Sequence, residues 1–187
     1  MRDGAPGDSI LIAQVTHSLD EKYGLPQKIA SEPETQQVIT QFLTRLQKAF
    51  GSLSAVKGRR ILDLGCGSNS SRSPTTGLIT PMFEPWFCRI LLELGADPVG
   101  VDLGDLSGEL FEHYGVDLAE SGALDFLPDS SFDGIQDSRI FGSPEFTTQH
   151  PAVGDYERIS REIKRQERRL LKPGGTIVHS DIAPEAP

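Results

Sequence analysis

The chain has 187 residues, of which 37% are hydrophobic and 24% charged, so we expect a globular protein with one domain or one domain plus a small extension. It contains no run of about 18 apolar residues, and residues 1–8 lack an apolar core, so neither a membrane span nor a secretory signal is predicted. The two cysteines, Cys66 and Cys88, form neither a disulfide framework nor a metal-binding spacing. We therefore expect a cytoplasmic protein without a metal.

The net charge is −9, and its distribution along the chain is uneven. No lysine or arginine lies between Ile90 and Ser138, whereas the rest of the chain carries 18 basic and 15 acidic residues. That stretch holds twelve acids: Glu93, Asp97, Asp102, Asp105, Glu109, Glu112, Asp117, Glu120, Asp125, Asp129, Asp133 and Asp137. Such a surface repels polyanions, which argues against DNA or RNA as a partner.

Residues 1–57 are predicted to form a helical extension. Ser9 is the expected N-cap of a first helix, which carries an apolar stripe at four-residue spacing. A second helix is expected to begin at the capping-box pair Ser31 and Glu34 and to stop at Gly51. Its buried face is expected to contain Val38, Phe42, Leu46, Ala49 and Phe50. The extension has two interpretations, simple packing or a lid over a ligand site, and packing is preferred.

Strands alternate with helices from residue 58 to residue 187, which predicts a parallel α/β sheet with right-handed crossovers. Short apolar runs at 60–64, 98–102, 110–116, 132–136 and 176–179 are the expected strands. Helices are expected at 85–94 and 155–171, and a turn at 172–175 should stop the second of them. The basic residues of the 155–171 helix are interpreted as a solvated face paired with its glutamates.

The most informative segment is the strand at 60–64 with the glycine turn Gly65-Cys66-Gly67 that follows it. Glycines allow the backbone to approach a ligand closely, and the carboxyl ends of strands are where open α/β sheets bind ligands. The segment is not the dinucleotide fingerprint, because that pattern needs glycine where Ser70 stands. Asp63 would disfavour a pyrophosphate and favour a cationic group. A purely structural strand–helix turn is the alternative.

Acids follow two further strands. Asp102 ends the second predicted strand, where a carboxylate can accept hydrogen bonds from both ribose hydroxyls, and Leu103 can cover an adenine face. Asp117 and Leu118 follow the third predicted strand, where the acid can accept from an adenine amino group. Three acids at three consecutive strand ends, counting Asp63, are more informative than one solvated charge.

With these motifs, residues 58–183 resemble the class I S-adenosylmethionine-dependent methyltransferases. The resemblance rests on five segments in order: 61–67, 99–102, 117–118, 127–133 and 170–175. It implies a Rossmann-like doubly wound sheet of about five strands in the order 3-2-1-4-5, with S-adenosylmethionine as cofactor and S-adenosylhomocysteine as product. It further implies residue roles as follows: Asp63, Gly65, Cys66 and Gly67 at the methionine end, Asp102 at the ribose, Leu103, Asp117 and Leu118 around the adenine, and Gln136 and Asp137 near the methionine part and the substrate.

The sequence departs from this family in three places. A loop at 68–83 replaces the helix that the family places after the glycine turn, and it could shape the substrate pocket or be a surface insertion. The connection between 102 and 110 is too short for a crossover helix, so either this helix is reduced to a turn or the third strand is misplaced. The chain also ends soon after the fifth strand, as a reduced version or a fragment would, and an exposed fifth strand would favour a homodimer.

Methyl transfer requires mainly alignment and exclusion of water, with a general base for some substrates. The candidate bases are Asp137, which is preferred, His150 and His179, while Arg139 is a possible anion contact. The segment 137–140 lacks the motif of enzymes that methylate base amino groups, so the expected acceptor is a small molecule. Two alternatives are a non-catalytic nucleoside-binding protein of the same fold and, less favoured, an NAD-dependent oxidoreductase.

Overall fold

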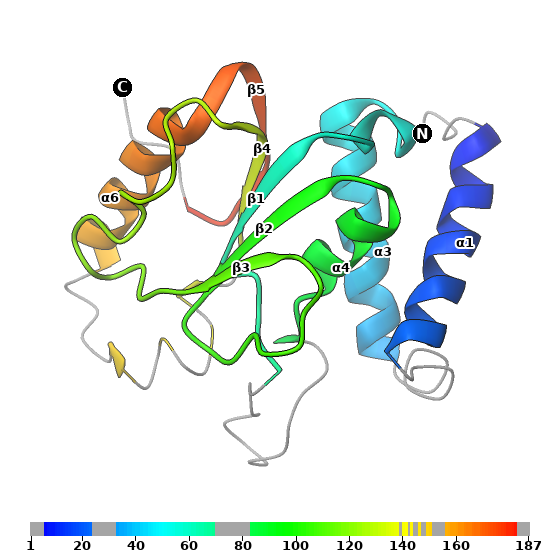
Figure 1. Ribbon diagram of the computed structural model, residues 1–187, viewed down its shortest axis with the longest axis horizontal. Coiled ribbons are helices and arrows are strands. Elements are labelled where there is room, and N and C mark those ends of the chain that lie inside the picture. The colour runs from blue at the N-terminus through cyan, green and yellow to red at the C-terminus, as the bar shows by residue number, and fades with distance from the viewer. Residues whose placement is uncertain are drawn as a thin grey trace.

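A computed structural model describes residues 6–23, 33–69, 83–138, 140–141, 143, 146, 149–150 and 156–182. Five parallel strands form one sheet in the order β3-β2-β1-β4-β5 (Figure 1). The strands are β1 (Arg60–Leu64), β2 (Asp97–Asp102), β3 (Glu112–Gly115), β4 (Phe132–Asp137) and β5 (Leu171–Ser180). The predicted Rossmann-like fold class and strand order are therefore confirmed.

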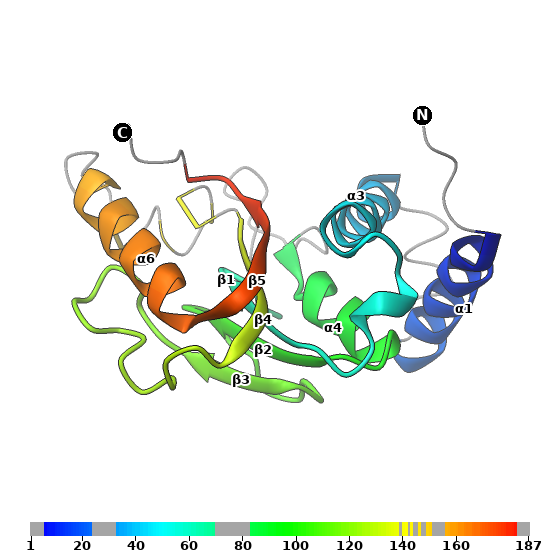
Figure 2. The ribbon, with the colours of Figure 1, turned by 90° about the horizontal axis from the view of Figure 1, so that it is seen from above.

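Helices cover both faces of the sheet (Figure 2). On one face lie α3 (Pro33–Phe50) and α4 (Trp86–Glu93), with α1 (Pro6–Lys22) packed outside them and the short 3-10 helix η1 (Ser54–Val56) beside them. On the other face lies α6 (Tyr156–Leu170). Each face has its own apolar core, because the strand residues alternate between the two layers.

The first helix begins earlier than predicted. Ser9 lies inside α1, which starts at Pro6, so the expectation that Ser9 is its N-cap is wrong. Asp8 explains the earlier start, because its buried carboxylate accepts hydrogen bonds from the Leu53 backbone N–H at 3.2 Å and from the Gln47 amide at 3.0 Å. The early start is thus supported by a tertiary contact and also by local signals, since Pro6 stands at the first helical position and Asp8 in the first turn.

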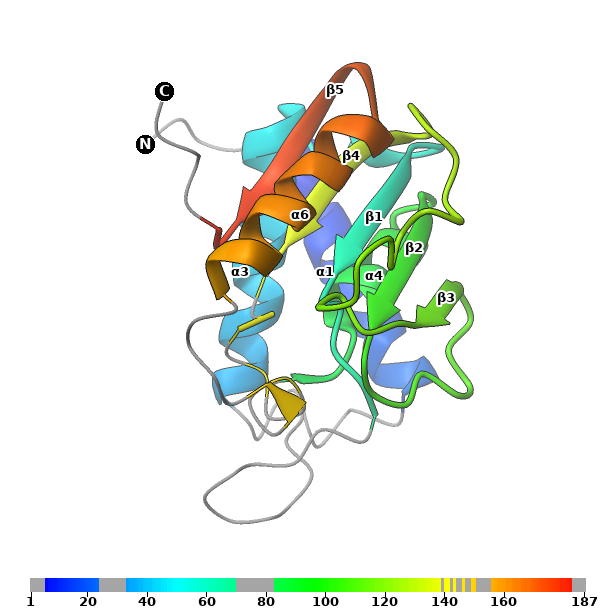
Figure 3. The same cartoon turned by 90° about the vertical axis from the view of Figure 1, so that its left-hand side faces the viewer.

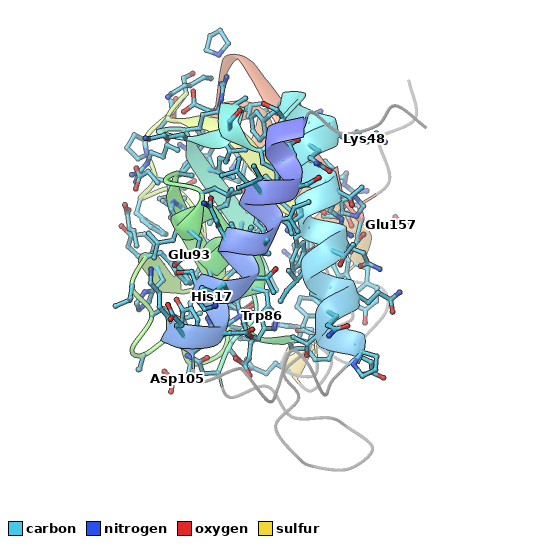
Figure 4. All side chains as sticks on the ribbon, turned by 90° about the vertical axis from the view of Figure 1, so that its right-hand side faces the viewer. His17, Lys48, Trp86, Glu93, Asp105 and Glu157 are labelled. Carbon is cyan, nitrogen blue, oxygen red and sulfur yellow. The ribbon has the colours of Figure 1, made fainter. Side chains whose placement is uncertain are left out.

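The second helix agrees with the sequence in the part that the structure describes. Val38, Phe42 and Leu46 are buried, and α3 ends at Phe50 before Gly51, whose φ is +83°. The capping residue expected at 31 lies outside the described residues. Helices α1 and α3 share one apolar core with α4 and β1. Glu93 of α4 also binds α1, at 2.6 Å from the ammonium of Lys22 (Figure 4).

The short connection after β2 forms turns rather than a helix, as expected from its length. Leu106 and Phe111 anchor these turns by packing against Cys66 and Cys88. The inserted loop predicted at 68–83 is described only at its two ends, since residues 70–82 lie outside the described ranges.

The turn predicted at 172–175 lies within the bounds of β5, so the predicted start of the fifth strand at 176 is wrong. β4 advances two residues from Phe132 to Gly134 while β5 advances five, from Leu171 to Thr176. The extra residues form a bulge that contains Gly174 at φ +79°. Pairing of Leu171 with Phe132 extends the strand beyond the turn. A homodimer through the outer edge of β5 stays a prediction.

No described helix has both the length and the apolar character required to cross a membrane.

Candidate functional site

A pocket opens at the carboxyl ends of β1 and β2, the edge to which the strand arrows point in Figure 3. The space inside it is about 310 Å³, a figure that includes open solvent. Its lining consists of Gly65, Asp102, Leu103, Val116, Asp117, Leu118, Ile140, Ser143 and Phe146. Five of these residues were predicted from the sequence as cofactor contacts: Gly65, Asp102, Leu103, Asp117 and Leu118.

Asp102 connects the glycine turn to the loop after β2. One oxygen of its carboxylate accepts a hydrogen bond from the Gly67 N–H at 2.8 Å, and the other accepts from the Gly104 N–H at 2.9 Å. Asp102 is only 8% exposed, yet it lines the pocket. These two bonds fix the orientation of the carboxylate at the edge of the pocket.

Asp117 follows β3 and is held in a similar way. Its Oδ1 accepts from the Ala119 N–H at 2.8 Å, and its Oδ2 lies 2.9 Å from Nε2 of His150. The ring of His150 packs against Phe146 with centroids 4.9 Å apart. Two carboxylates, Asp102 and Asp117, and one aromatic ring therefore border the same pocket.

The glycine turn itself is closely packed by other parts of the chain. Gly65 and Gly67 adopt φ values of +73° and +94°, which only glycine tolerates readily. A Cβ at Gly67 would lie 2.2 Å from the carbonyl oxygen of Phe83, and one at Gly65 would lie 2.8 Å from a side-chain carbon of Ile140. The glycines are thus required by contacts within the protein, which the sequence did not indicate.

We expect Gly67→Ala to destabilise the fold by about 3 kcal/mol, because it combines an unfavourable φ with a backbone clash. Gly108→Ala is the matched control, since Gly108 has φ +89° but nothing within 4 Å of the added methyl, so it should cost only about 1 kcal/mol. Urea unfolding of both variants measures the difference. Equal losses of unfolding free energy in the two variants would show that the Phe83 carbonyl oxygen does not clash with a methyl group at position 67.

Asp63 and Gln136 lie together behind the glycine turn rather than in the pocket lining. The Gln136 amide donates to Asp63 Oδ1 at 3.2 Å, and Arg45 of α3 donates to the Gln136 carbonyl at 3.5 Å. Burial raises the pKa of Asp63 to about 8, because removal from water disfavours the charged form. A carboxyl with this pKa carries a proton near neutral pH. Asp63 therefore does not offer the negative charge that was expected to favour a cationic group.

The two cysteines are buried against each other and share the space beside Gly100. Burial raises the pKa of the Cys66 thiol well above its usual range and that of Cys88 to about 11. Both are therefore neutral thiols, whereas a reactive cysteine needs a stabilised thiolate. Cys66 and Gly67 adjoin the pocket in sequence, but the pocket lining does not include them.

The preferred base candidate, Asp137, is fully buried beneath α6. Its carboxylate accepts from the Lys164 ammonium at 3.2 Å and from the backbone N–H groups of Asp181 and Ile182 at 2.9 and 3.3 Å. The structure thus places Asp137 in a structural network without access to the pocket.

The other two candidates are also hydrogen-bonded. His179 pairs with Gln136 in the sheet register, and its Nε2 lies 2.8 Å from Asp181 Oδ1. His150 binds Asp117, as described above. None of the three lines the pocket, and Arg139 lies outside the described residues. Within the described ranges, no group of three or more histidines, cysteines or acids is placed to hold a metal ion.

Sequence reasoning missed Arg89 of α4, whose side chain is only 4% exposed. Its guanidinium binds Glu84 and Glu109, each at 2.6 Å, and donates to the Asn69 carbonyl at 2.9 Å. It also lies 4.1 Å from the ring centroid of Tyr23. Arg89 thereby joins the residues that follow the glycine turn to α1 and α4. Its signal in the sequence was the one basic residue in a mainly apolar helix.

The basic surface of α6 is largely paired, in agreement with the expectation for that helix. Arg165 binds Glu162 at 2.6 Å, and Arg169 binds the carboxylate of Asp129 and the carbonyl oxygens of Leu124 and Leu127. The basic residues of α6 thus pair with acids and carbonyl oxygens of the protein itself.

No family model and no curated protein match the chain. A solved structure from Methanococcus maripaludis, provisionally described as an S-adenosyl-L-methionine-dependent methyltransferase, is similar at 12% sequence identity with a TM-score of 0.42. The similarity covers 97% of this chain and 68% of that one. A likeness of this size carries no argument about the site or its function.

Proposed function

We propose that the pocket binds the adenosine part of S-adenosylmethionine and that the protein transfers the methyl group to a small-molecule acceptor. The observation that carries this proposal is the convergence of Asp102 and Asp117 on one pocket. Their carboxylates suit the ribose hydroxyls and the adenine amino group, while Leu103, Leu118 and Phe146 suit the flat faces of a base.

The charge of the lining supports a nucleoside rather than a phosphorylated ligand. The described lining residues include two carboxylates and no lysine or arginine. A pyrophosphate would be repelled, whereas a sulfonium would be attracted. This observation disfavours the NAD-dependent alternative.

The cofactor supplies an already activated methyl group, so the protein's task is to bind, orient and exclude water. Asp102 and Asp117 would hold the adenosine part of the cofactor. Ile140, beside Gly65, would border the methionine part. Because Ile140 and Phe83 pack closely against the glycine turn, the proposal is better supported for the adenosine part of the cofactor than for its methionine part.

A non-catalytic nucleoside-binding protein is the second candidate. It is favoured by the positions of Asp137, His150 and His179, each of which is hydrogen-bonded to other residues and outside the pocket lining. Methyl transfer to an acceptor that needs no base remains compatible with the same positions.

Isothermal titration with S-adenosylhomocysteine, adenosine 5′-monophosphate and NAD tests the proposed ligand. We expect one site for S-adenosylhomocysteine, weaker binding of the monophosphate and no heat from NAD. Tight NAD binding without a response to S-adenosylhomocysteine would overturn the proposal. Mass spectrometry of acceptor mixtures incubated with S-adenosylmethionine then separates the two candidates, because binding without any methylated product favours the non-catalytic one.

A further inference from the structure

Arg89 of α4 joins three segments that are separate in the sequence. Its guanidinium donates at 2.9 Å to the side-chain carbonyl of Asn69, where the chain leaves the glycine turn. It also binds Glu84, just before α4, and Glu109, in the loop after β2, each at 2.6 Å. The Asn69 amide closes this cluster, because it donates to Glu109 at 3.0 Å. The cluster therefore fixes the three segments relative to one another.

The guanidinium is also held between aromatic rings. Its central carbon lies 4.1 Å from the ring centroid of Tyr23 and 4.7 Å from that of Trp86. Removing such a charge from water is costly, and well-packed apolar side chains often stabilise a fold at least as well as a buried ion pair. The planar fork of an arginine, however, holds several acceptors in fixed directions, which an apolar side chain does not do. The chemistry of Arg89 thus suits placement of the segments around it.

Two of these segments supply the backbone donors that hold Asp102. The Gly67 N–H, in the glycine turn, donates to one carboxylate oxygen, and the Gly104 N–H, in the loop after β2, donates to the other. The turn and the loop are also bound to each other, since the Asn69 N–H donates to the Asp105 carbonyl at 2.9 Å. The orientation of the Asp102 carboxylate therefore depends on two segments that Arg89 joins.

The third segment packs directly against the glycine turn. Phe83, the residue before Glu84, accepts a hydrogen bond from the Ser68 N–H at 2.8 Å. A Cβ at Gly67 would clash with the same Phe83 carbonyl oxygen, so the turn has no room to shift toward it. By binding Glu84, Arg89 holds this peptide in place against the turn.

We propose that Arg89 is a positioning residue for the nucleoside pocket: it fixes the glycine turn and the loop after β2, and these segments orient the Asp102 carboxylate for the ribose hydroxyls. Arg89 is not among the residues that line the pocket, so it acts through these segments and not by contact with the ligand. The inference rests on the proposed function, because the ribose is the group that Asp102 is proposed to bind. A change at Arg89 should therefore affect recognition of ribose hydroxyls more than binding of the adenine.

Arg89→Lys tests this role, because lysine keeps the positive charge beside Glu84 and Glu109 but lacks the planar fork. The full chain is titrated with adenosine and with 2′-deoxyadenosine, which lacks one ribose hydroxyl. The wild type should bind adenosine roughly tenfold more tightly, the factor for one hydrogen bond to a charged acceptor. In Arg89→Lys we expect this ratio to fall to about twofold, because a carboxylate in the wrong orientation makes a poor hydrogen bond to the hydroxyl.

Glu93→Gln is the matched control on the same helix. Glu93 binds Lys22 and Ser18 of α1 rather than the glycine turn (Figure 4). The variant should lower the melting temperature and keep the wild-type ratio of the two affinities. A ratio that falls only in Arg89→Lys would thus separate placement of Asp102 from a general loss of stability.

Asn69→Ala is a second test that changes no charge and applies even where Arg89→Lys does not fold. It removes the amide that lies between Arg89 and Glu109 and leaves both ion pairs of Arg89 in place. We expect the ratio of the two affinities to fall in the same direction as in Arg89→Lys. Circular dichroism and thermal melts show which variants are folded.

A wild-type ratio in folded Arg89→Lys and in Asn69→Ala would overturn the positioning role and leave the proposed function intact. An equal fall of the ratio in Glu93→Gln would also overturn it, because the ratio would then follow stability alone. A wild type that binds both nucleosides equally would overturn the role as well, since Asp102 would not recognise the hydroxyl. Absence of any binding of adenosine and S-adenosylhomocysteine by the wild type would overturn the proposed function and the positioning role together.

Discussion

Asp102→Ala is expected to weaken S-adenosylhomocysteine binding by at least about a hundredfold and to lower the melting temperature. The ribose would lose two hydrogen bonds to a charged acceptor, each worth roughly 1.5–3 kcal/mol. The protein would also lose the acceptor for the Gly67 and Gly104 N–H groups, which leaves two backbone donors without this partner. One substitution thus affects both the ligand and the turn that borders it.

Two further variants separate these effects. Asp102→Asn retains one carbonyl acceptor but removes the charge, so we expect a fold close to that of the wild type with intermediate affinity. Asp105→Asn is the matched control, because Asp105 is an exposed acid in the same loop whose carboxylate caps the Ser107 N–H. Titration calorimetry gives the affinities and thermal melts give the stabilities. If folded Asp102→Ala bound like the wild type, the ribose assignment would be wrong.

Most strands could be located from the sequence because they contain short apolar runs with a polar or glycine boundary, although β3 (Glu112–Gly115) does not. The sheet order came from the resemblance of motifs and not from the runs themselves. The errors lie where tertiary contacts override local signals. Asp8 extends α1 through its bonds to Leu53 and Gln47, and the pairing of Leu171 with Phe132 extends β5 through a bulge.

The half of the pocket at the strand ends was also predictable, since the carboxyl ends of parallel strands share one edge. The other wall is formed by Ile140, Ser143 and Phe146, and the last two belong to the segment 141–150, which is predicted from the sequence to help form the acceptor pocket. Nothing in the sequence indicates that His150 meets Asp117.

Asp63 shows why a motif does not determine a side chain's surroundings. β1 is buried on both faces, so its sequence does not reveal on which face Asp63 lies. The structure places it with Gln136 and Cys88, on the face covered by α3 and α4. A carboxylate expected at the ligand is thereby a protonated, buried group.

This burial predicts that the protein becomes less stable as the pH rises from 5.5 to 9. Burial raises the pKa of Asp63 to about 8, and the pKa of Glu167 is raised by burial and by the neighbouring Asp137 carboxylate. Above the ordinary carboxyl pKa near 4 the unfolded chain has released these protons while the folded chain keeps them. Each unit of pH therefore costs the folded state about 1.4 kcal/mol per group until the folded-state pKa is reached.

For Asp63 the loss between pH 5.5 and 8 amounts to about 3 kcal/mol, after which the contribution is constant. Glu167 adds a further decrease in the stability of the folded state as the pH rises. Its Oε1 is buried without a hydrogen-bond partner, while Oε2 binds Lys164 at 2.9 Å. An amide in its place would retain a bond to Lys164 without a proton to lose.

We therefore expect Glu167→Gln and Asp63→Asn each to reduce the decline in unfolding free energy between pH 5.5 and 9, with Glu167→Gln more stable than the wild type at pH 9 by about 1–2 kcal/mol. Glu157→Gln is the control, because Glu157 is an exposed acid of α6 (Figure 4). Urea unfolding at each pH measures the effect. A wild type equally stable at both pH values, or a decline unchanged in both buried variants, would show that these carboxyls are ionised in the folded protein, with the Lys164 ammonium and the Gln136 amide sufficient to hold their charges.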